Sequence, residues 1–252
     1  MHRWFLIFVV LLASCGGPPR TGVFLEGTFE LEDDRQEGVV TEMRYLLRFP
    51  ERWQPGETLP LVVYLHGSGD DDYDSRWLTG FGVPAAIRFG PVGDHQRFVL
   101  LAPQAAPGTS WEMAGQVDAV MRLVDEVIGD HGLDLDRVSV TGMSMGGYGT
   151  WHLVTRYPDR FQSAASVSGS GYGRTELPTD LDVCRIADVR FRAYHGSEDL
   201  VSALSLNRAV VEAWEVRCGA ELDFRVVEGT GHFTTADEVY SDPGFYDWLL
   251  TD

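Results

Sequence analysis

The amino acid most clearly missing from this 252-residue chain is lysine, because all 20 of its basic side chains are arginine. An arginine guanidinium stays protonated and cannot act as a base, so Schiff-base chemistry, a pyridoxal lysine, a serine–lysine dyad and a P-loop lysine are excluded. Positive charge is scarce as well, since 38 acidic side chains give a formal net charge of −18. A surface this acidic repels phosphate backbones and anionic head groups. We therefore expect no nucleic-acid partner.

The chain also lacks a low-complexity linker and an internal repeat. Its composition, with 44% hydrophobic and 23% charged residues, is that of an ordinary globular protein. At roughly 150 residues per domain the length allows one or two domains, and the missing linker favours one. We predict a signal peptide over residues 1–14, a tether over residues 15–30 and a single folded domain over residues 31–252.

The first fifteen residues have the three-part pattern of an export signal. Arg3 gives a positive start, the apolar run Trp4–Leu12 follows, and small residues precede Cys15. The apolar run is too short to cross a membrane comfortably, so we expect it to be cleaved. The segment Leu12–Cys15 resembles the lipobox of bacterial lipoproteins, which implies a lipid anchor on Cys15 and a place on the periplasmic or cell-surface face of a bacterial membrane. A plain export signal with an incidental cysteine is the alternative.

Two further cysteines, Cys184 and Cys218, complete the set of three. An exported protein meets an oxidising compartment in which the two can pair. Two unrelated buried thiols are the alternative, and the sequence leaves both open. Neither cysteine has the spacing of a zinc or redox motif, so we expect no metal bound through sulfur.

From Val39 onwards, β-rich runs alternate with helical patterns, which is typical of a mainly parallel sheet with crossover helices. Two runs are apolar without alternation, which indicates strands covered on both faces; they are Leu61–Leu65 and Phe98–Ala102. The other predicted strands are Val39–Phe49, Val138–Thr141, Ala164–Ser168, Val189–Tyr194 and Leu222–Val227, and the predicted helices are Val117–Ile128, Gly149–Tyr157, Ser202–Arg217 ending at Gly219, and Pro243–Leu250. The fold class is therefore α/β, with a mostly parallel twisted sheet and helices on both faces.

A candidate nucleophile follows the predicted strand Val138–Thr141. Residues 142–146 read Gly-Met-Ser-Met-Gly, which is G-x-S-x-G between a strand and a helix. In that context Ser144 occupies a sharp, strained turn, and the flanking glycines let neighbouring backbone pass close to it. The turn also puts Ser144 at a helix N-terminus, where partial positive charge favours a developing anion. We predict Ser144 as the nucleophile.

A serine hydroxyl needs a base to take its proton, and the base needs an acid to orient it. Where G-x-S-x-G occupies a turn of this kind, the three residues follow the order serine, acid, histidine. Asp199 and His232 each follow one of the last two predicted strands. Because parallel strands share a direction, both loops open at the sheet edge that carries Ser144.

Four short motifs resemble the α/β-hydrolase superfamily, and within it the carboxylesterase-, phospholipase- and predicted-peptidase-like serine esterases. They are LHGSG at residues 65–69, GMSMGGYGTW at residues 142–151, HGSED at residues 195–199 and GTGH at residues 229–232. The resemblance covers nearly the whole mature chain. It implies that Ser144 is the nucleophile, Asp199 the acid and His232 the general base.

One departure from the family pattern concerns the acid. Relatives often continue this loop with two valines and a proline, whereas Asp199 is followed by Leu-Val-Ser-Ala. Glu198 is therefore the second candidate for the acid and Asp237 the third. Two other histidines, His66 and His195, each precede a glycine after a strand, and we interpret both as structural residues that hold loops.

The oxyanion formed in acyl transfer needs preorganised N–H donors. One is the amide of Met145, the residue after the nucleophile, and the resemblance implies that the amide of Ser68 is the other. Trp111 and Tyr172 lie in loops expected at the substrate end of the sheet; we predict both as substrate-binding residues, with a core position as the alternative for Trp111. The acidic run at residues 69–74 lacks EF-hand spacing, so we interpret it as a solvated loop rather than a calcium site.

The sequence thus predicts an exported serine esterase that cleaves carboxylic esters through an acyl-enzyme, with no metal or cofactor. No long insertion between Phe161 and Val189 indicates a large lid, which favours short-chain or carbohydrate-linked acyl groups over long lipid chains. A peptidase or thioesterase with the same three residues is the alternative, and a non-catalytic surface-binding lipoprotein is a distant one. The acyl group, the alcohol and the oligomeric state stay open.

Overall fold

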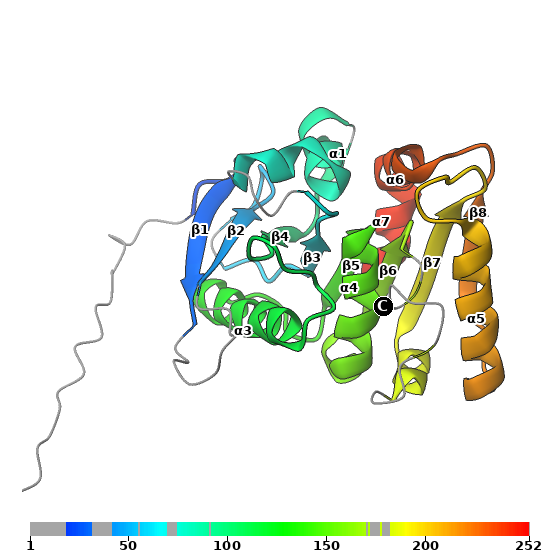
Figure 1. Cartoon of the computed structure of the whole chain (residues 1–252). Coiled ribbons are helices and arrows are strands. Elements are labelled where there is room, and N and C mark those ends of the chain that lie inside the picture. The colour runs from blue at the N-terminus through cyan, green and yellow to red at the C-terminus, as the bar shows by residue number, and fades with distance from the viewer. Residues whose placement is uncertain are drawn as a thin grey trace, which may run out of the picture.

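A computed structural model describes residues 19–31, 42–54, 56–69, 75–90, 92–169, 171, 177 and 182–251. Within these residues an eight-stranded sheet runs through the molecule in the order β1-β2-β4-β3-β5-β6-β7-β8 (Figure 1). The strands from β3 to β8 pair in parallel, whereas β1 and β2 are antiparallel at one edge. The strands are β1 (Leu25–Glu30), β2 (Glu42–Arg48), β3 (Leu61–Leu65), β4 (Val99–Pro103), β5 (Val138–Met143), β6 (Ser163–Val167), β7 (Arg190–Gly196) and β8 (Asp223–Val227).

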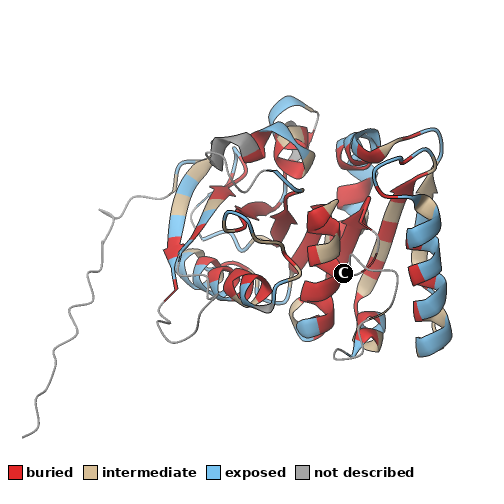
Figure 2. Cartoon of the chain, in the orientation of Figure 1, coloured by how far each residue is buried: buried red, intermediate tan, exposed pale blue. Residues whose placement is uncertain are grey.

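The central strands are buried along their whole length, as their apolar sequences predict. Every residue of β3, β4, β5 and β6 is buried, whereas the residues of the edge strand β8 are half-buried or exposed. Figure 2 shows this burial running through the middle of the sheet and fading toward the outer helix faces. A parallel sheet needs cover on both faces because its crossover connections place helices there. The predicted α/β class and mostly parallel sheet are confirmed.

Helices cover the two faces of the sheet and enclose a separate apolar core on each. One face carries α3 (Ala114–His131), α4 (Met145–Arg156) and α5 (Leu204–Cys218), and the other carries α1 (Gly82–Phe89), α6 (His232–Ser241) and α7 (Pro243–Leu250). Shorter helical segments are α2 (Val92–His95), η1 (Ser75–Gly80), η2 (Pro158–Arg160) and η3 (Val183–Asp188). Gly219 ends α5 in the left-handed conformation, with φ of 65°, and Asp242 caps α7, so the predicted ends of these two helices are confirmed.

The structure corrects the predicted boundary between tether and folded domain. Leu25–Glu30 forms β1 and pairs along its length with β2, and Phe29 and Leu31 are buried in the core. Along β1, residues turned toward the protein alternate with exposed ones, which is the two-residue period of a strand with one covered face. The folded part therefore includes residues 25–30, which the sequence analysis assigned to the tether. The sequence analysis also missed α1, α2 and α6.

The N-terminal prediction lies outside the described residues, because the structure does not describe residues 1–18. Across the part of the chain that it describes, no helix is both long enough and apolar enough to cross a membrane. The question about the other two cysteines is answered. Cys184 of η3 and Cys218 at the end of α5 form a disulfide, with 5.2 Å between their Cα atoms. The bond ties the C-terminal end of α5 to the segment that leads into β7.

Candidate active site

Ser144 stands between the end of β5 and the start of α4 in a strained conformation. Its φ of 57° and ψ of −117° make it one of two non-glycine residues with positive φ among those described. Such backbone costs on the order of 1–3 kcal/mol and persists where the surroundings impose it. A Cβ at Gly142 would lie 2.2 Å from the Gly146 carbonyl oxygen, and one at Gly146 would lie 1.9 Å from the Leu65 carbonyl oxygen. Both glycines are required, as predicted.

His232 meets Ser144 from the other face of the sheet, as the first residue of α6. Its Nε2 lies 2.9 Å from Ser144 Oγ, and its Nδ1 lies 2.7 Å from Asp199 Oδ2. Because a carboxylate only accepts, Nδ1 carries the proton and Nε2 accepts from the serine hydroxyl. The Ser168 hydroxyl donates to the His232 carbonyl at 3.1 Å, which holds the start of α6. The three predicted residues are thus brought together in one hydrogen-bonded chain.

Asp199 is the carboxylate that reaches the histidine, and the alternative acids do not. The Asp199 side chain is buried, and its Oδ1 accepts from the amides of Val201 and Ser202 at 2.9 and 2.8 Å. Glu198 and Asp237 are exposed on the surface. These two amides reach the Asp199 carboxylate because the loop reverses direction immediately after β7. The departure from the family pattern after Asp199 therefore leaves the geometry of the acid intact.

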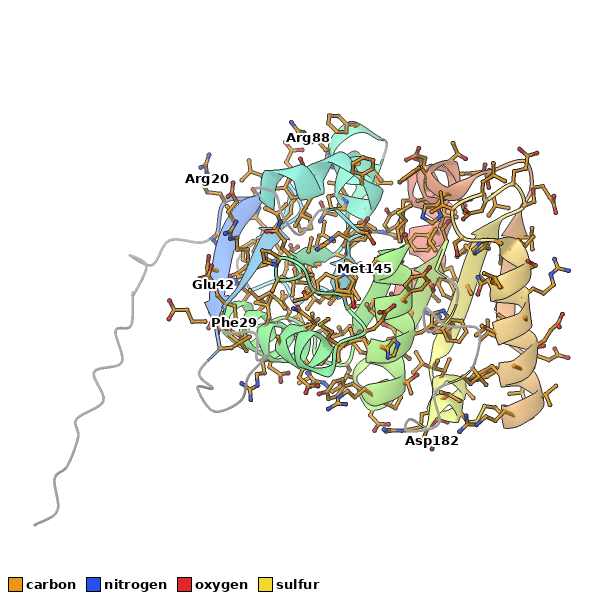
Figure 3. All side chains as sticks on the ribbon, in the orientation of Figure 1. Arg20, Phe29, Glu42, Arg88, Met145 and Asp182 are labelled. Atoms are coloured by element: carbon orange, nitrogen blue, oxygen red, sulfur yellow. A yellow bond between two sulfur atoms is a disulfide. The ribbon has the colours of Figure 1, made fainter. Side chains whose placement is uncertain are left out.

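The two predicted oxyanion donors lie on the segments that border Ser144. Met145 is the first residue of α4, labelled at the upper end of that helix in Figure 3, and the first amides of a helix have no partner within it. Ser68 lies in the turn after β3. The preceding Gly67 packs on the nucleophile turn, since a Cβ there would lie 3.7 Å from Ser144 Cβ. Both amides are therefore at the correct edge of the sheet, and their role stays a prediction.

His66 holds the turn after β3 through its ring and its backbone, as its structural interpretation predicts. Its Nδ1–H donates to the Gly67 carbonyl at 2.7 Å, and its Nε2 accepts from the Ala105 amide at 3.0 Å. The Trp111 indole N–H donates to the His66 carbonyl at 3.0 Å. This arrangement fixes the backbone on which Ser68 lies.

Trp111 is a core residue, which corrects its prediction as a substrate-binding residue. Its side chain is 0% exposed, and a Cβ at Gly149 of α4 would lie 2.4 Å from the Trp111 Cβ. The indole fills the space under α4, and its N–H is already bonded to the His66 carbonyl. It therefore offers no surface to a substrate. Tyr172 and the acidic residues 70–74 lie outside the described residues. Within the described part of the chain, no cluster of three or more His, Cys, Asp or Glu side chains could hold a metal ion.

The sequence analysis missed an exposed pair of phenylalanines, one of which lies next to His232. Phe233 is 58% exposed and lies edge-on to the His232 ring, with 5.3 Å between ring centroids. Phe81, which precedes α1, is 47% exposed, and its ring centroid lies 6.4 Å from that of Phe233. The only sequence signal was the position of Phe233 next to the predicted base. The pair gives the site an apolar border.

Known proteins similar to this chain include several esterases. Feruloyl esterase B of Thermothelomyces thermophilus is 25% identical over 182 residues, which are 68% of this chain and 56% of that protein. A bifunctional acetylxylan esterase/xylanase of Neocallimastix patriciarum is 27% identical over 132 residues, 48% of this chain and 18% of that protein. The chain thus spans about half or less of the length of these relatives.

Solved structures share the fold. A thermostable esterase matches 90% of this chain and 62% of its own, with a TM-score of 0.71 and 26% identity. The feruloyl esterase module from Clostridium thermocellum matches 93% of this chain and 90% of its own, with a TM-score of 0.68 and 14% identity. The model of a family described as putative esterases matches residues 37–179. Because that match covers more than half of the chain, the protein belongs to the putative esterase family.

Proposed function

We propose that the protein is a serine esterase that cleaves carboxylic esters through an acyl-enzyme. The observation that carries the proposal is the hydrogen-bonded chain of Ser144, His232 and Asp199, with contacts of 2.9 and 2.7 Å. Ser144 Oγ attacks the ester carbonyl while His232 Nε2 takes its proton, and Asp199 holds the ring and stabilises the imidazolium. His232 then gives the proton to the leaving alcohol. Water repeats the sequence and frees the acid.

The developing oxyanion is held by the amides of Met145 and Ser68. The start of α4 supports the first donor, because helix N-terminal amides point outward with partial positive charge. The rigid turn that His66 holds supports the second, since a preorganised donor costs no rearrangement during the reaction. No metal or cofactor takes part in these steps.

The substrates proposed are esters of short-chain or carbohydrate-linked acyl groups. Relatives named as feruloyl and acetylxylan esterases support this class. Phe81 and Phe233 offer an apolar surface at the site, against which an acyl or alcohol group loses its contact with water. Burying apolar area contributes about 25 cal/mol per Å², so such contacts add to substrate binding rather than to the chemical step.

A fluorophosphonate probe tests the serine mechanism. The wild-type chain should be labelled at Ser144 and should hydrolyse p-nitrophenyl acetate and butyrate. Ser144→Ala and His232→Ala should lose the label, with kcat lower by roughly 10⁴-fold or more. Ser205→Ala, at an exposed serine of α5, is the matched control and should behave as wild type. A folded wild-type chain without adduct or turnover would overturn the proposal and favour a binding role.

A substrate panel tests the class of ester. Acetyl, butyryl and feruloyl esters are compared with an acylated peptide and a thioester of the same acyl group. The proposal expects the highest kcat/KM for the oxygen esters. Phe233→Ala should raise KM for butyryl and feruloyl esters by roughly fivefold with little change for acetyl esters. Phe89→Ala, at an exposed phenylalanine that ends α1, is the control and should change neither.

The proposed location is the periplasmic or cell-surface face of a bacterial membrane, with a lipid anchor on Cys15. The lipobox-like segment Leu12–Cys15 supports this part of the proposal. Expression with a labelled fatty acid should give a labelled, membrane-bound chain. Cys15→Ser should lose the label and the membrane attachment while the signal keeps its other residues. Equal labelling of both chains would contradict the anchor.

A further inference from the structure

His195, at the end of β7, is a buried histidine that the proposed mechanism does not use. Its side chain is 0% exposed, and its Nε2 lies 3.4 Å from Asp199 Oδ2, the same oxygen that accepts the hydrogen bond from His232 Nδ1–H. A second imidazole therefore faces the carboxylate of the acid from within the core. A buried titratable group in this place needs a reason, because burial disfavours its charged form.

The tautomer of His195 is fixed by its two partners. Its Nε2 lies 2.6 Å from the Ser202 carbonyl oxygen, which only accepts, so Nε2 carries the proton. Its Nδ1 therefore accepts, and the donor is the side-chain amide of Asn207 at 3.0 Å. Asn207 is 0% exposed, and among the described residues its Oδ1 has no hydrogen-bond partner. The chain thus tolerates an unsatisfied buried oxygen, which is costly, in order to place this one donor.

The ring of His195 controls the backbone that binds Asp199. Ser202 is held at both of its main-chain polar atoms, since its amide donates to Asp199 Oδ1 at 2.8 Å and its carbonyl accepts from His195. A chain of contacts therefore leads from Asn207 through His195 and Ser202 to the acid. It ends at the hydrogen bond between Asp199 and His232.

Few charged groups face His195. Asp199 of its own loop and His232 at the start of α6 act on it electrostatically, whereas α5 contributes the uncharged amide of Asn207. Burial is the largest influence and lowers the pKa of His195 below its ordinary value, which the Ser202 carbonyl and the Asp199 charge offset in part. The neutral ring presents an N–H dipole to the acid without competing with His232 for its charge.

We propose that His195 and Asn207 are positioning residues for the acid: Asn207 selects the tautomer of His195, and the Nε2–H of His195 fixes the Ser202 backbone that orients the Asp199 carboxylate toward His232. This inference rests on the proposed serine esterase function. It predicts that the pair acts on the chemical step and not on substrate binding, because neither residue lies where a substrate would touch it.

Variants that keep or remove the Nε2–H donor test the proposal. Gln has its amide nitrogen as many bonds from Cβ as the Nε2 of His, so His195→Gln should keep at least about half of kcat. His195→Leu removes the donor and should lower kcat by at least about tenfold, with KM within about twofold, an effect similar in size to that of the outer hydrogen-bond partners of metal ligands. Asn207→Leu removes one of the two partners that fix the tautomer and keeps the ring, so its loss of kcat should be smaller.

The second measurement is the proton resonance of His232 Nδ1–H, which lies far downfield in a short, charge-assisted hydrogen bond. It should keep its position in His195→Gln and shift or broaden in His195→Leu and Asn207→Leu. His131→Leu, at a half-buried histidine of α3 that packs edge-on against Phe49, controls for general destabilisation and should leave the resonance and kcat unchanged.

The outcomes separate the two proposals. Equal kcat in His195→Gln and His195→Leu, or an unchanged resonance in His195→Leu, would overturn the positioning role even in an active enzyme. If His195→Leu does not fold, Asn207→Leu decides, and wild-type kcat with a wild-type resonance there would overturn the role. A wild-type chain without ester turnover would overturn the proposed function instead, while the resonance still tests the positioning of Asp199.

Discussion

Two His-Gly pairs, one after β3 and one after β7, look alike in the sequence but are held in different ways. Both histidines are buried, yet they carry opposite tautomers. His66 donates from Nδ1 to a carbonyl and accepts from the Ala105 amide at Nε2, so both of its ring nitrogens have main-chain partners. His195 donates from Nε2 and depends at Nδ1 on the side chain of Asn207. The ring in the turn after β3 is thus bound to main-chain atoms at both nitrogens, whereas the ring in the turn after β7 depends at one nitrogen on a side chain of α5.

The glycines of the two pairs differ as well. A Cβ at Gly196 would lie 2.3 Å from the Thr230 carbonyl oxygen and from Thr235 Oγ1. At Gly67 the nearest atom would be the Met143 sulfur, 3.5 Å away, which is ordinary contact. The loop of the acid is therefore packed tightly against the loop that carries His232. The turn after β3 leaves space, and that space lies beside the nucleophile.

The largest effect is expected from the disulfide, because it anchors the helix on which the β7 turn depends. Cys184→Ala combined with Cys218→Ala opens a loop of 34 residues, which should lower the free energy of unfolding by about 3–4 kcal/mol. Urea unfolding at pH 7 measures this. Reductant should bring the wild-type chain to the same value and should not affect the double variant.

The same double variant sharpens the comparison of the two turns. Amide hydrogen exchange should become faster in α5 and in the turn after β7. In the turn after β3 it should become faster only by the amount that the lower free energy of global unfolding explains. Equal acceleration in both turns would show that the disulfide stabilises the whole molecule without a special link to α5.

A matched pair of alanines should separate stability from activity. Gly196→Ala forces atoms together and should lower the free energy of unfolding by about 1–3 kcal/mol. Gly67→Ala should lower the free energy of unfolding by less than about 1 kcal/mol. It places a methyl group 3.7 Å from Ser144 Cβ, so kcat/KM should fall although the stability changes little. Urea unfolding and ester hydrolysis on both variants check this. Similar losses in the two variants would contradict the difference in packing.

The chain order of strands and motifs was enough to predict that Ser144, Asp199 and His232 lie together, because each follows a strand of a parallel sheet. Ser144, Asp199 and His232 meet for that reason, and Asp199 rather than Glu198 faces the histidine because only one of two neighbours can point inward. The tertiary partners of these residues could not be predicted. No local sequence pattern indicates that Asn207 turns toward His195.

Trp111 shows where motif reasoning ends. Its loop does follow β4 at the expected end of the sheet, but the depth of a side chain depends on what packs above it. Here a glycine of α4 leaves room for the indole, since a Cβ at Gly149 would lie 2.4 Å from Trp111 Cβ. Phe81 and Phe233 form an aromatic pair from segments 152 residues apart, and only the packing of α1 beside α6 joins them. Strand β1 was missed for a different reason. Residues 16–22 before it are rich in glycine and proline, and the predicted tether was extended from them through residue 30.

The smallest effect expected concerns proton uptake by His195. Burial lowers the pKa of His195 below its ordinary value of 6.5, so below that pH the unfolded chain takes up a proton at this residue that the folded chain does not. The unfolded state then binds more protons, and the free energy of unfolding falls as the pH drops from about 7 to 5, by at most about 1.4 kcal/mol per pH unit for one group.

His195→Gln removes this titration and keeps the donor to Ser202, so its stability should fall less steeply with decreasing pH than that of the wild type. Urea unfolding at pH 5, 6 and 7 measures the slopes. Burial also lowers the pKa of His131, so His131→Gln should flatten the curve in the same way but without touching the acid. Parallel curves for wild type and His195→Gln would mean that the folded chain protonates His195 as readily as the unfolded chain does. An imidazolium beside Asp199 would then compete with His232 for the carboxylate, and the difference between the two His-Gly turns would be one of charge and not only of hydrogen bonding.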